Sequence, residues 1–307
     1  MNKPIFIFSI DTEMLWGPAG GQDGVYQYNL IKKNENEMRD VFSTLLNLFE
    51  KYNVPVTWAI VGHLFLDRCN IDTCQTTINM KKYGYTYPWY RDPCSNLQKD
   101  PLYYGKDIVE KILHNPIKHE LAYHSFSHVC FTSISREMAE DEIKESKRIE
   151  KEWNIKFISF VYPMNEIAYV DILKKYDFKI YRSKTPLILQ NQNHYFSKQI
   201  ENGLSKIIAP SVEPLWENGI WNLKSSMTFF DSQLPNSLMI RFKIGLERAI
   251  KNKRIFHIWL HPWNLFYYKK LASDLEEMLY YVSKKRDNKK ITIMTMQGLV
   301  EFLDKNK

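Results

Sequence analysis

Five residues of the types that can bind a metal and move protons lie beside short apolar stretches of this sequence. Asp11 and Glu13 lie in "SIDTEMLWG", and His124 and His128 lie in "ELAYHSFSHVCF". Another histidine, His261, lies in "IFHIWLHPW". Two imidazoles and one carboxylate around Zn²⁺ or a related divalent ion leave a coordination position open for water. A second carboxylate can then act as a base and a further histidine as an acid, so the residue types predict a hydrolytic metal site.

The spacing of two of these histidines does not decide between a metal site and a polar surface turn. His124 and His128 face one ion if residues 124–128 form a helical turn, because side chains four apart then share a face. What favours the metal site is the position of the other candidates, which lie at the matching ends of predicted strands.

Apolar runs that alternate with amphipathic stretches predict strands connected by helices. Alternation of this kind is typical of right-handed β-α-β units, and therefore of a parallel sheet or barrel. The predicted strands are 4–11, 54–62, 120–125, 157–164, 178–183, 255–261 and 291–296. The predicted helices are 37–51, 136–153, 237–252 and 268–284.

The candidate side chains fall at the C-terminal ends of these predicted strands. Asp11 and Glu13 end the first strand and His261 ends the sixth. Asn165 follows the fourth strand and Arg182 ends the fifth. Because the C-terminal ends of the strands in parallel α/β barrels meet at one face, we expect these side chains to converge.

Composition and charge narrow the class of protein. The chain has 307 residues, 44% hydrophobic content and a formal charge of +7. Its lysines are spread among acids and asparagines, which favours a solvated surface over a nucleic-acid site. Four cysteines without a C-x-x-C pair are too few for a disulfide scaffold. The first residues are interpreted as a strand and not a signal peptide, and no apolar run reaches membrane-spanning length. We therefore expect a cytoplasmic protein, with a peripheral position at the inner membrane face as an alternative.

The chain is predicted to form a single domain, residues 1–307, with insertions or lids at about 64–105 and 184–236. Both regions are irregular in pattern, and loops of this length are usually functional. The first contains Cys69 and Cys74, which with His63 could form a second metal site. Buried thiols in a loop are the favoured interpretation at this stage.

Four motifs in the expected order resemble the polysaccharide deacetylases of carbohydrate esterase family 4, which include the chitooligosaccharide deacetylases. They are "FSIDTEMLWG", "HELAYHSFSH", "FVYPMNE" and "WLHPW", and the resemblance runs from about residue 5 to residue 300. It implies an irregular (β/α) barrel of about seven parallel strands. It also implies hydrolysis of an N-acetyl amide, with Asp11 as base, His261 as acid, and Glu13, His124 and His128 as metal ligands. The implied cofactor is one divalent ion, Zn²⁺ first, with Co²⁺ or Ni²⁺ as alternatives.

Three features depart from the family pattern. Thr12 separates Asp11 from Glu13 where many members have adjacent aspartates, which leaves open which acid is the base. Met164 stands where relatives often have the basic residue that orients the base, and Arg182 is one candidate for that role. The lack of an export signal favours a nucleotide-linked or lipid-linked glycan precursor of a surface polysaccharide as the substrate.

Residues beside the predicted site are candidates for contacts with an N-acetylated sugar or glycan. They are Trp16, Pro163, Asn165, Arg182 and Trp263. Two other functions stay open: hydrolysis of another amide, including deformylation, by the same fold, and catalytically silent carbohydrate binding. The sequence does not determine the oligomeric state.

Overall fold

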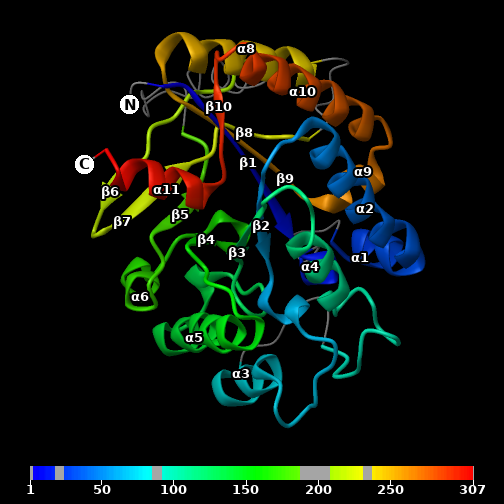
Figure 1. Ribbon diagram of the computed structural model, residues 1–307. Helices are drawn as coiled ribbons and strands as arrows, with labels where there is room; N and C mark the ends of the chain where they lie inside the picture. Colours follow the sequence, from blue (N-terminus) through cyan, green and yellow to red (C-terminus); the bar gives the residue numbers. More distant parts are fainter. Residues whose placement is uncertain (1–2, 18–23, 85–91, 187–207, 231–236, 307) are drawn as a thin grey trace, which may run out of the picture.

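The computed structural model of the protein describes residues 3–17, 24–84, 92–186, 208–230 and 237–306. These residues form a curled β-sheet surrounded by helices (Figure 1). The strand order is β6-β7-β5-β4-β3-β2-β1-β9-β8, and β10 pairs with β1. Among the described residues, all pairs of adjacent strands are parallel except β6 with β7. The strands are β1 (Ile5–Thr12), β2 (Thr57–Ile60), β3 (Glu120–Tyr123), β4 (Ser159–Val161), β5 (Ile180–Ser183), β6 (Leu215–Glu217), β7 (Ile220–Lys224), β8 (Met227–Thr228), β9 (Ile255–Leu260) and β10 (Thr292–Ile293).

The two ends of this sheet are joined by one short stretch of chain. β7 and β8 lie at or near opposite ends of the strand order, yet only Ser225 and Ser226 separate them. The Ser225 N–H donates to the carbonyl of Ser183 on β5 at 3.1 Å. The next N–H, of Ser226, donates to the carbonyl of His257 on β9 at 2.6 Å. Residues 220–228 therefore bridge both ends of the curl, and the predicted irregular barrel is confirmed.

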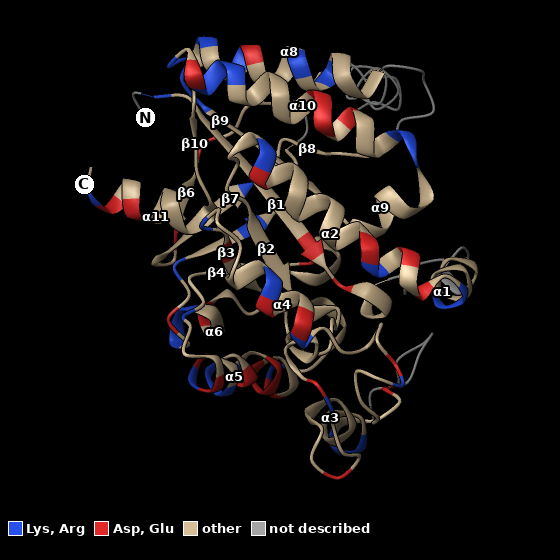
Figure 2. Cartoon of the chain, turned by 45° about the vertical axis from the view of Figure 1, so that its right-hand side comes forward, with Lys and Arg blue, Asp and Glu red and all other residues tan. Residues whose placement is uncertain are grey.

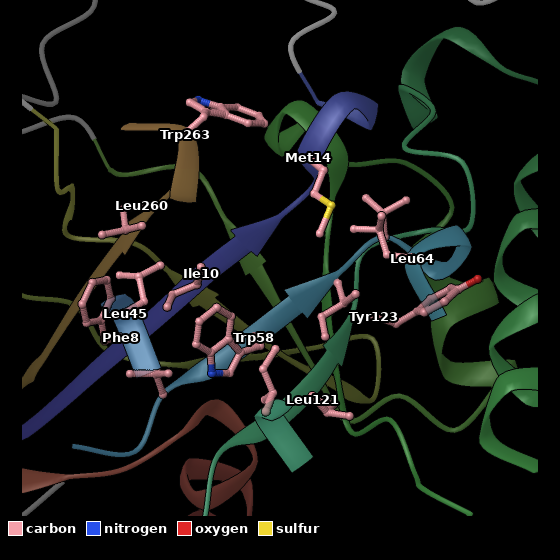
Figure 3. Close-up of a cluster of buried hydrophobic side chains, with 14 of the residues drawn as sticks. Phe8, Ile10, Met14, Leu45, Trp58, Leu64, Leu121, Tyr123, Leu260 and Trp263 are labelled. Carbon is pink, nitrogen blue, oxygen red and sulfur yellow. The ribbon is translucent and has the colours of Figure 1, made fainter. Parts of the chain in front are cut away.

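Alternation along β1 separates an interior face from a helix-covered face, as the period of two in a strand requires. Ile5 and Ile7 pack with apolar side chains of the other strands inside the curl. Phe8 and Ile10 pack outward, where Figure 3 shows them near Leu45 of α2. Asp11 therefore shares the interior face of β1 with Ile5 and Ile7 and needs a polar partner there.

Helices cover the outside of the sheet. Figure 1 shows α8 and α10 together on one side and α5 with α3 on another. The N-terminus of α5 is capped by the Ser135 hydroxyl, which accepts from the Met138 N–H at 3.2 Å. The helices are α1 (Gly24–Lys33), α2 (Glu35–Tyr52), α3 (Gln75–Tyr83), α4 (Lys106–Leu113), α5 (Arg136–Trp153), α6 (Val170–Lys175), α8 (Ser237–Asn252), α9 (Pro262–Tyr267), α10 (Lys270–Asp287) and α11 (Met296–Asp304).

The C-terminal helix α11 packs against the interior apolar cluster at the N-terminal end of the strands. A buried carboxylate, Glu120 of β3, accepts from the Gln297 N–H at 2.9 Å and from the Thr57 hydroxyl at 2.8 Å. Thr57 in turn accepts from the Met296 N–H at 2.9 Å. The first N–H groups of α11, which have no partner within the helix, are thereby satisfied. Burial raises the pKa of Glu120.

Each predicted strand and helix is present, with its ends moved by a few residues. The region predicted to be irregular after residue 184 contains β6, β7 and β8, which were not predicted. Other parts of the two predicted insertions, 85–91, 187–207 and 231–236, lie outside the described residues. Figure 2 shows basic and acidic residues interspersed along α5, α8 and α10. In the described part of the chain, no helix has both the length and the apolar character needed to cross a bilayer.

Replacing Glu120 with alanine is expected to lower the free energy of unfolding by about 1–3 kcal/mol, because buried donors lose their acceptor. Urea denaturation measures the change. Glu110→Ala on the exposed face of α4 is the control and should leave stability nearly unchanged. Equal effects of the two substitutions would contradict this account of how α11 docks.

Candidate metal and catalytic site

Three predicted ligands meet above the C-terminal ends of β1 and β3. The Nε2 atom of His124 lies 2.9 Å from Glu13 Oε1, and the Nε2 atom of His128 lies 3.0 Å from the same oxygen. Their three potential ligand atoms lie within 4.8 Å of one another, and all three residues are buried. A nitrogen–nitrogen–oxygen donor set of this kind suits Zn²⁺ and leaves a position for water.

The protonation of His124 tests whether these residues fit a cation. Its Nδ1 atom lies 2.7 Å from the carbonyl oxygen of Val161, which can only accept a hydrogen bond. Nδ1 therefore carries the proton, and in the neutral ring Nε2 presents a lone pair to the Glu13 carboxylate. Two acceptors at 2.9 Å repel each other unless a cation, either a proton or a metal ion, lies between them. One ligand atom from each of Glu13, His124 and His128 lies within 4.8 Å of the other two, so the residues fit a metal.

The loop that carries the two histidines is not the helical turn expected from their spacing. Ser125 and His128 have φ angles of 58° and 55°, in the left-handed region, and no helix covers residues 124–128. The loop is instead held by buried Glu142 of α5, whose Oε2 accepts from the N–H groups of Phe126 and Ser127 at 3.0 and 2.8 Å. This correction has a physical cause, because side-chain capping here replaces helical hydrogen bonds.

Asp11 has a different partner from Glu13. The Nη1 and Nη2 atoms of Arg182 donate to its two carboxylate oxygens at 2.6 and 2.5 Å, in a bidentate pair. Both side chains are buried, at 0% and 3% exposure. Burial alone would raise the pKa of Asp11, but the guanidinium outweighs it and lowers that pKa. Asp11 is therefore held ionised and fixed in orientation.

The remaining faces of Arg182 are also occupied. Nη1 donates to Ser9 Oγ at 3.1 Å, and Nη2 donates to Asn165 Oδ1 at 3.2 Å. The guanidinium carbon lies 4.4 Å from the ring centroid of Trp259, a cation–π contact. Met164, which takes the position of the missing basic residue, is 45% exposed. In this chain the arginine that contacts the first acid thus comes from β5.

His261 stands across from both acids. Its Nε2 lies 3.5 Å from Glu13 Oε1 and 3.9 Å from Asp11 Oδ2. Burial would lower the pKa of His261, but the two carboxylates outweigh burial and raise it. Its ring stacks on Trp263 at a centroid distance of 4.2 Å and an angle of 14°. The His261 side chain keeps 21% exposure, which opens this side of the site to solvent.

Gly17 lies so close to the site that no side chain fits there. A Cβ atom on Gly17 would lie 1.7 Å from Glu13 Oε2 and 2.3 Å from the Trp263 ring. Residues 18–23, which follow Gly17, lie outside the described residues.

The predicted sugar-contacting residues have different surroundings. Trp16 is fully buried against the ring of His63, so neither of its faces is open to a sugar. Pro163 is buried, and Arg182 donates to both Asn165 and Asp11. Trp263 is 8% exposed beside His261. Of this set, Trp263 is the one best placed to meet a ligand.

Several residues at the site were not singled out from the sequence. Ser9 lies two residues before Asp11, so the period of a strand would have placed both on the interior face. Glu142 is an acid on the apolar stripe of a helix, four residues after Met138, which is a signal for a buried carboxylate. Gly17 and Trp259 gave no comparable signal.

Comparison with known proteins agrees with this geometry. The sequence model of the polysaccharide deacetylase family matches residues 33–181, which include His124 and His128. The resemblance to this family that the sequence motifs predicted is confirmed over these residues. The match supports a hydrolytic deacetylase that acts on a carbohydrate. Asp11, Glu13, Arg182 and His261 lie outside the matched residues, so their roles depend on geometry.

Solved structures extend the likeness over the whole chain. A proposed polysaccharide deacetylase from Mycobacterium smegmatis superposes with a TM-score of 0.65 at 12% identity, covering 100% of this chain and 92% of its own. A carbohydrate esterase domain of a xylanase from the hindgut metagenome of Trinervitermes trinervoides gives 0.44 at 13% identity, covering 99% and 92%. A peptidoglycan deacetylase from Bacillus subtilis gives 0.44 at 11%, covering 99% and 93%. The first likeness shows the deacetylase fold. No curated protein matches the chain in sequence.

Replacing Arg182 with methionine is expected to lower the free energy of unfolding by about 3–5 kcal/mol, because Asp11 then stays buried without its counter-charge. Adding Asp11→Asn should recover much of the loss, since the uncompensated charge is gone. Guanidinium denaturation measures both variants. Arg136→Met, at an exposed pair with Asp171, is the control and should change stability little. An Arg182→Met variant as stable as the wild type would contradict the structural role of the pair.

The free energy of unfolding is expected to depend on pH through Glu142, because burial raises the pKa of this carboxyl group to about 7. Three N–H groups that donate to Glu142 oppose the shift but do not cancel it. Between pH 4.5 and 7 the unfolded chain loses this proton before the native state does. Native stability, relative to a non-titrating Glu142→Gln variant, should therefore fall as pH rises through this range. The fall is up to about 3 kcal/mol. Denaturation of both proteins at several pH values measures it, and a constant difference would contradict the raised pKa.

Proposed function

We propose that this chain is a metal-dependent deacetylase that removes the N-acetyl group from an amino sugar in a glycan or a glycan precursor. The observation that carries the proposal is that two acids separated by one residue, Asp11 and Glu13, contact different partners. Glu13 points at the Nε2 atoms of His124 and His128, whereas Asp11 is bound by Arg182. These different partners support a proposal in which Glu13 is a metal ligand and Asp11 is the base.

The ligand set proposed is Glu13, His124 and His128, with Zn²⁺ as the favoured ion and Co²⁺ or Ni²⁺ as alternatives. When bound, the ion would supply a Lewis acid and lower the pKa of a water molecule. The His124 ring is held by its hydrogen bond to the Val161 carbonyl, and both histidines lie on the loop whose N–H groups bind Glu142. Burial of all three ligands keeps bulk water from competing with them.

Asp11 is proposed to accept the proton of the attacking water. Arg182 keeps the Asp11 carboxylate ionised and aims its oxygens, because the bidentate pair fixes the plane of the carboxyl group. A new carbon–oxygen bond then forms at the acetyl carbonyl. The sequence left open which acid is the base, and we propose Asp11 for that role and Glu13 for the ligand.

His261 is proposed to donate a proton to the leaving nitrogen as the carbon–nitrogen bond breaks. The two carboxylates raise the pKa of His261, which favours the protonated ring that an acid needs, and stacking on Trp263 fixes the plane of the ring. Products are acetate and a free amino sugar. His261 is the more solvent-exposed member of the site, which fits contact with an incoming glycan.

The substrate class is proposed to be an N-acetylated sugar on a nucleotide-linked or lipid-linked carrier in surface polysaccharide biosynthesis. A cytoplasmic location and the single-domain organisation with two insertions stay predictions with it. Trp263 is the proposed sugar contact, since its ring lies beside the proposed acid.

Acetate release from N-acetylglucosamine oligomers and UDP-N-acetylglucosamine tests this function, with metal content measured on the same samples. His128→Ala should lose both metal and activity. Asp11→Asn should keep the metal, with kcat lowered by about 10²–10⁴-fold. His114→Ala, at an exposed histidine of the α4 C-cap, is the matched control and should behave as the wild type.

Two results would contradict the proposal. One is wild-type kcat in Asp11→Asn. The other is a metal-loaded wild type that binds these sugars but releases no acetate, which would leave the chain a silent carbohydrate-binding protein.

A further inference from the structure

A second group of metal-ligand side chains lies in the region between β2 and β3. His63 comes from the short helix η2 (Gly62–Phe65), and Cys74 is the N-cap of α3. Cys69 and Asp92 come from irregular segments between these elements and α4. One ligand atom from each of the four residues lies within 4.8 Å of all the others. No residue of the proposed deacetylase site belongs to this group.

Asp92 stands at the centre of the group. Its Oδ2 lies 2.9 Å from the Cys74 sulfur, 3.4 Å from the Cys69 sulfur and 3.1 Å from His63 Nε2. Around Zn²⁺, bond lengths of about 2.0 Å to N or O and 2.3 Å to S place neighbouring ligand atoms roughly 3.3–3.8 Å apart in a tetrahedron. The observed separations need to open by about 0.1–0.6 Å, most of all between Asp92 and the Cys74 sulfur.

The ring of His63 is prepared for a metal at Nε2. Its Nδ1 lies 3.0 Å from the carbonyl oxygen of Tyr103, an acceptor, so Nδ1 carries the proton. This is the outer contact that metal-binding histidines commonly make, and it leaves the Nε2 lone pair facing the group. Nε2 is buried and makes no hydrogen bond among the described residues, although Asp92 is near. His63 Nε2 and Asp92 Oδ2 lie 3.1 Å apart, and a cation there, either a proton or a metal ion, satisfies both atoms.

The backbone around the cysteines is fixed by hydrogen bonds. The Cys69 N–H donates to the Ser95 carbonyl at 3.1 Å, and the Leu97 N–H donates to the Asp67 carbonyl at 2.7 Å. The other oxygen of Asp92 accepts from the Cys94 N–H at 2.9 Å. The group is therefore an ordered arrangement, and the Tyr104 hydroxyl also lies 3.5 Å from this oxygen of Asp92.

We propose that His63, Cys69, Cys74 and Asp92 bind a structural Zn²⁺ ion distinct from the ion of the deacetylase site. Two thiolates, one imidazole and one carboxylate complete a tetrahedral shell from protein atoms alone. A closed shell leaves no position for water, so this ion holds structure and does no chemistry. Binding releases the two thiol protons. The interpretation as buried loop thiols, favoured from the sequence, is replaced by this one because Asp92 adds the fourth ligand.

The second ion would brace the loop that carries His124 and His128. The N–H groups of Gly62 and His63 donate to the carbonyls of Ser125 and Phe126 at 2.7 and 3.0 Å. The His63 ring also packs on Trp16, three residues after Glu13, with ring centroids 4.4 Å apart. Loss of this ion should therefore weaken the first site indirectly. The inference itself does not depend on the proposed deacetylase activity.

Cobalt substitution of the reduced, full-length protein tests the inference. Metal is removed with a chelator, Co²⁺ is titrated in, and total metal is measured beside the absorption spectrum. Thiolate ligands give near-ultraviolet charge-transfer absorption that a histidine and carboxylate site lacks. Wild type should bind two equivalents and show this absorption. His124→Ala/His128→Ala should bind one equivalent and keep it.

The variant Cys69→Ser/Cys74→Ser should lose the charge-transfer absorption and about one equivalent of metal. Cys130→Ser is the matched control, because that thiol lies against Thr132, outside the group, and should change neither readout. The wild-type titration decides the matter even if the double variant fails to fold. Reduced wild type that shows no charge-transfer absorption would overturn the proposal. So would a wild type that binds one equivalent of metal and loses it in His124→Ala/His128→Ala but not in Cys69→Ser/Cys74→Ser.

Discussion

The bidentate ion pair between Arg182 and Asp11 is the interaction on which the arrangement of the site depends. Moving two charges out of water costs several kcal/mol per ion, and the cost is offset only by good geometry and further hydrogen bonds. Here Ser9, Asn165 and the face of Trp259 supply those contacts. Because both oxygens of Asp11 pair with Arg182, Glu13 is left as the acid that faces the histidines. Two neighbouring carboxylates on one strand end thus acquire different chemistry from different partners.

The barrel provides the geometry for this pair. β1 and β5 are separated in the sheet by β2, β3 and β4, so their inward side chains meet across the interior only because the sheet curls. The stretch 220–228 holds that curl closed through hydrogen bonds to Ser183 and His257. At the opposite end, α11 fills the interior and Glu120 satisfies its N-terminus. The interior of the barrel is thus apolar at the N-terminal end of the strands, where α11 packs, and carries the ion pair and the candidate site at their C-terminal end.

Sequence patterns were enough to predict seven of the ten strands, the ends at which polar residues meet, and the family resemblance. Strand alternation and helical periodicity are local signals, and β1 and α5 carry them strongly. The partner of Asp11 was only one candidate among several, since pairing Arg182 with it requires the register of strands four positions apart. The left-handed backbone at Ser125 and His128 has no local signal, because neither residue is glycine. Asp92 lies 18 residues after Cys74, so only the fold brings it to the cysteines.

Anomalous diffraction from crystals of the zinc-loaded protein, recorded on both sides of the zinc absorption edge, tests the central claim most directly. The account predicts a strong peak about 2.0–2.2 Å from a Glu13 oxygen and from the Nε2 atoms of His124 and His128. Asp11 should remain paired with Arg182 beside it. A peak bound through Asp11, with Glu13 turned away, would reverse the roles of the two acids. The absence of any peak at these residues would contradict the metal site itself.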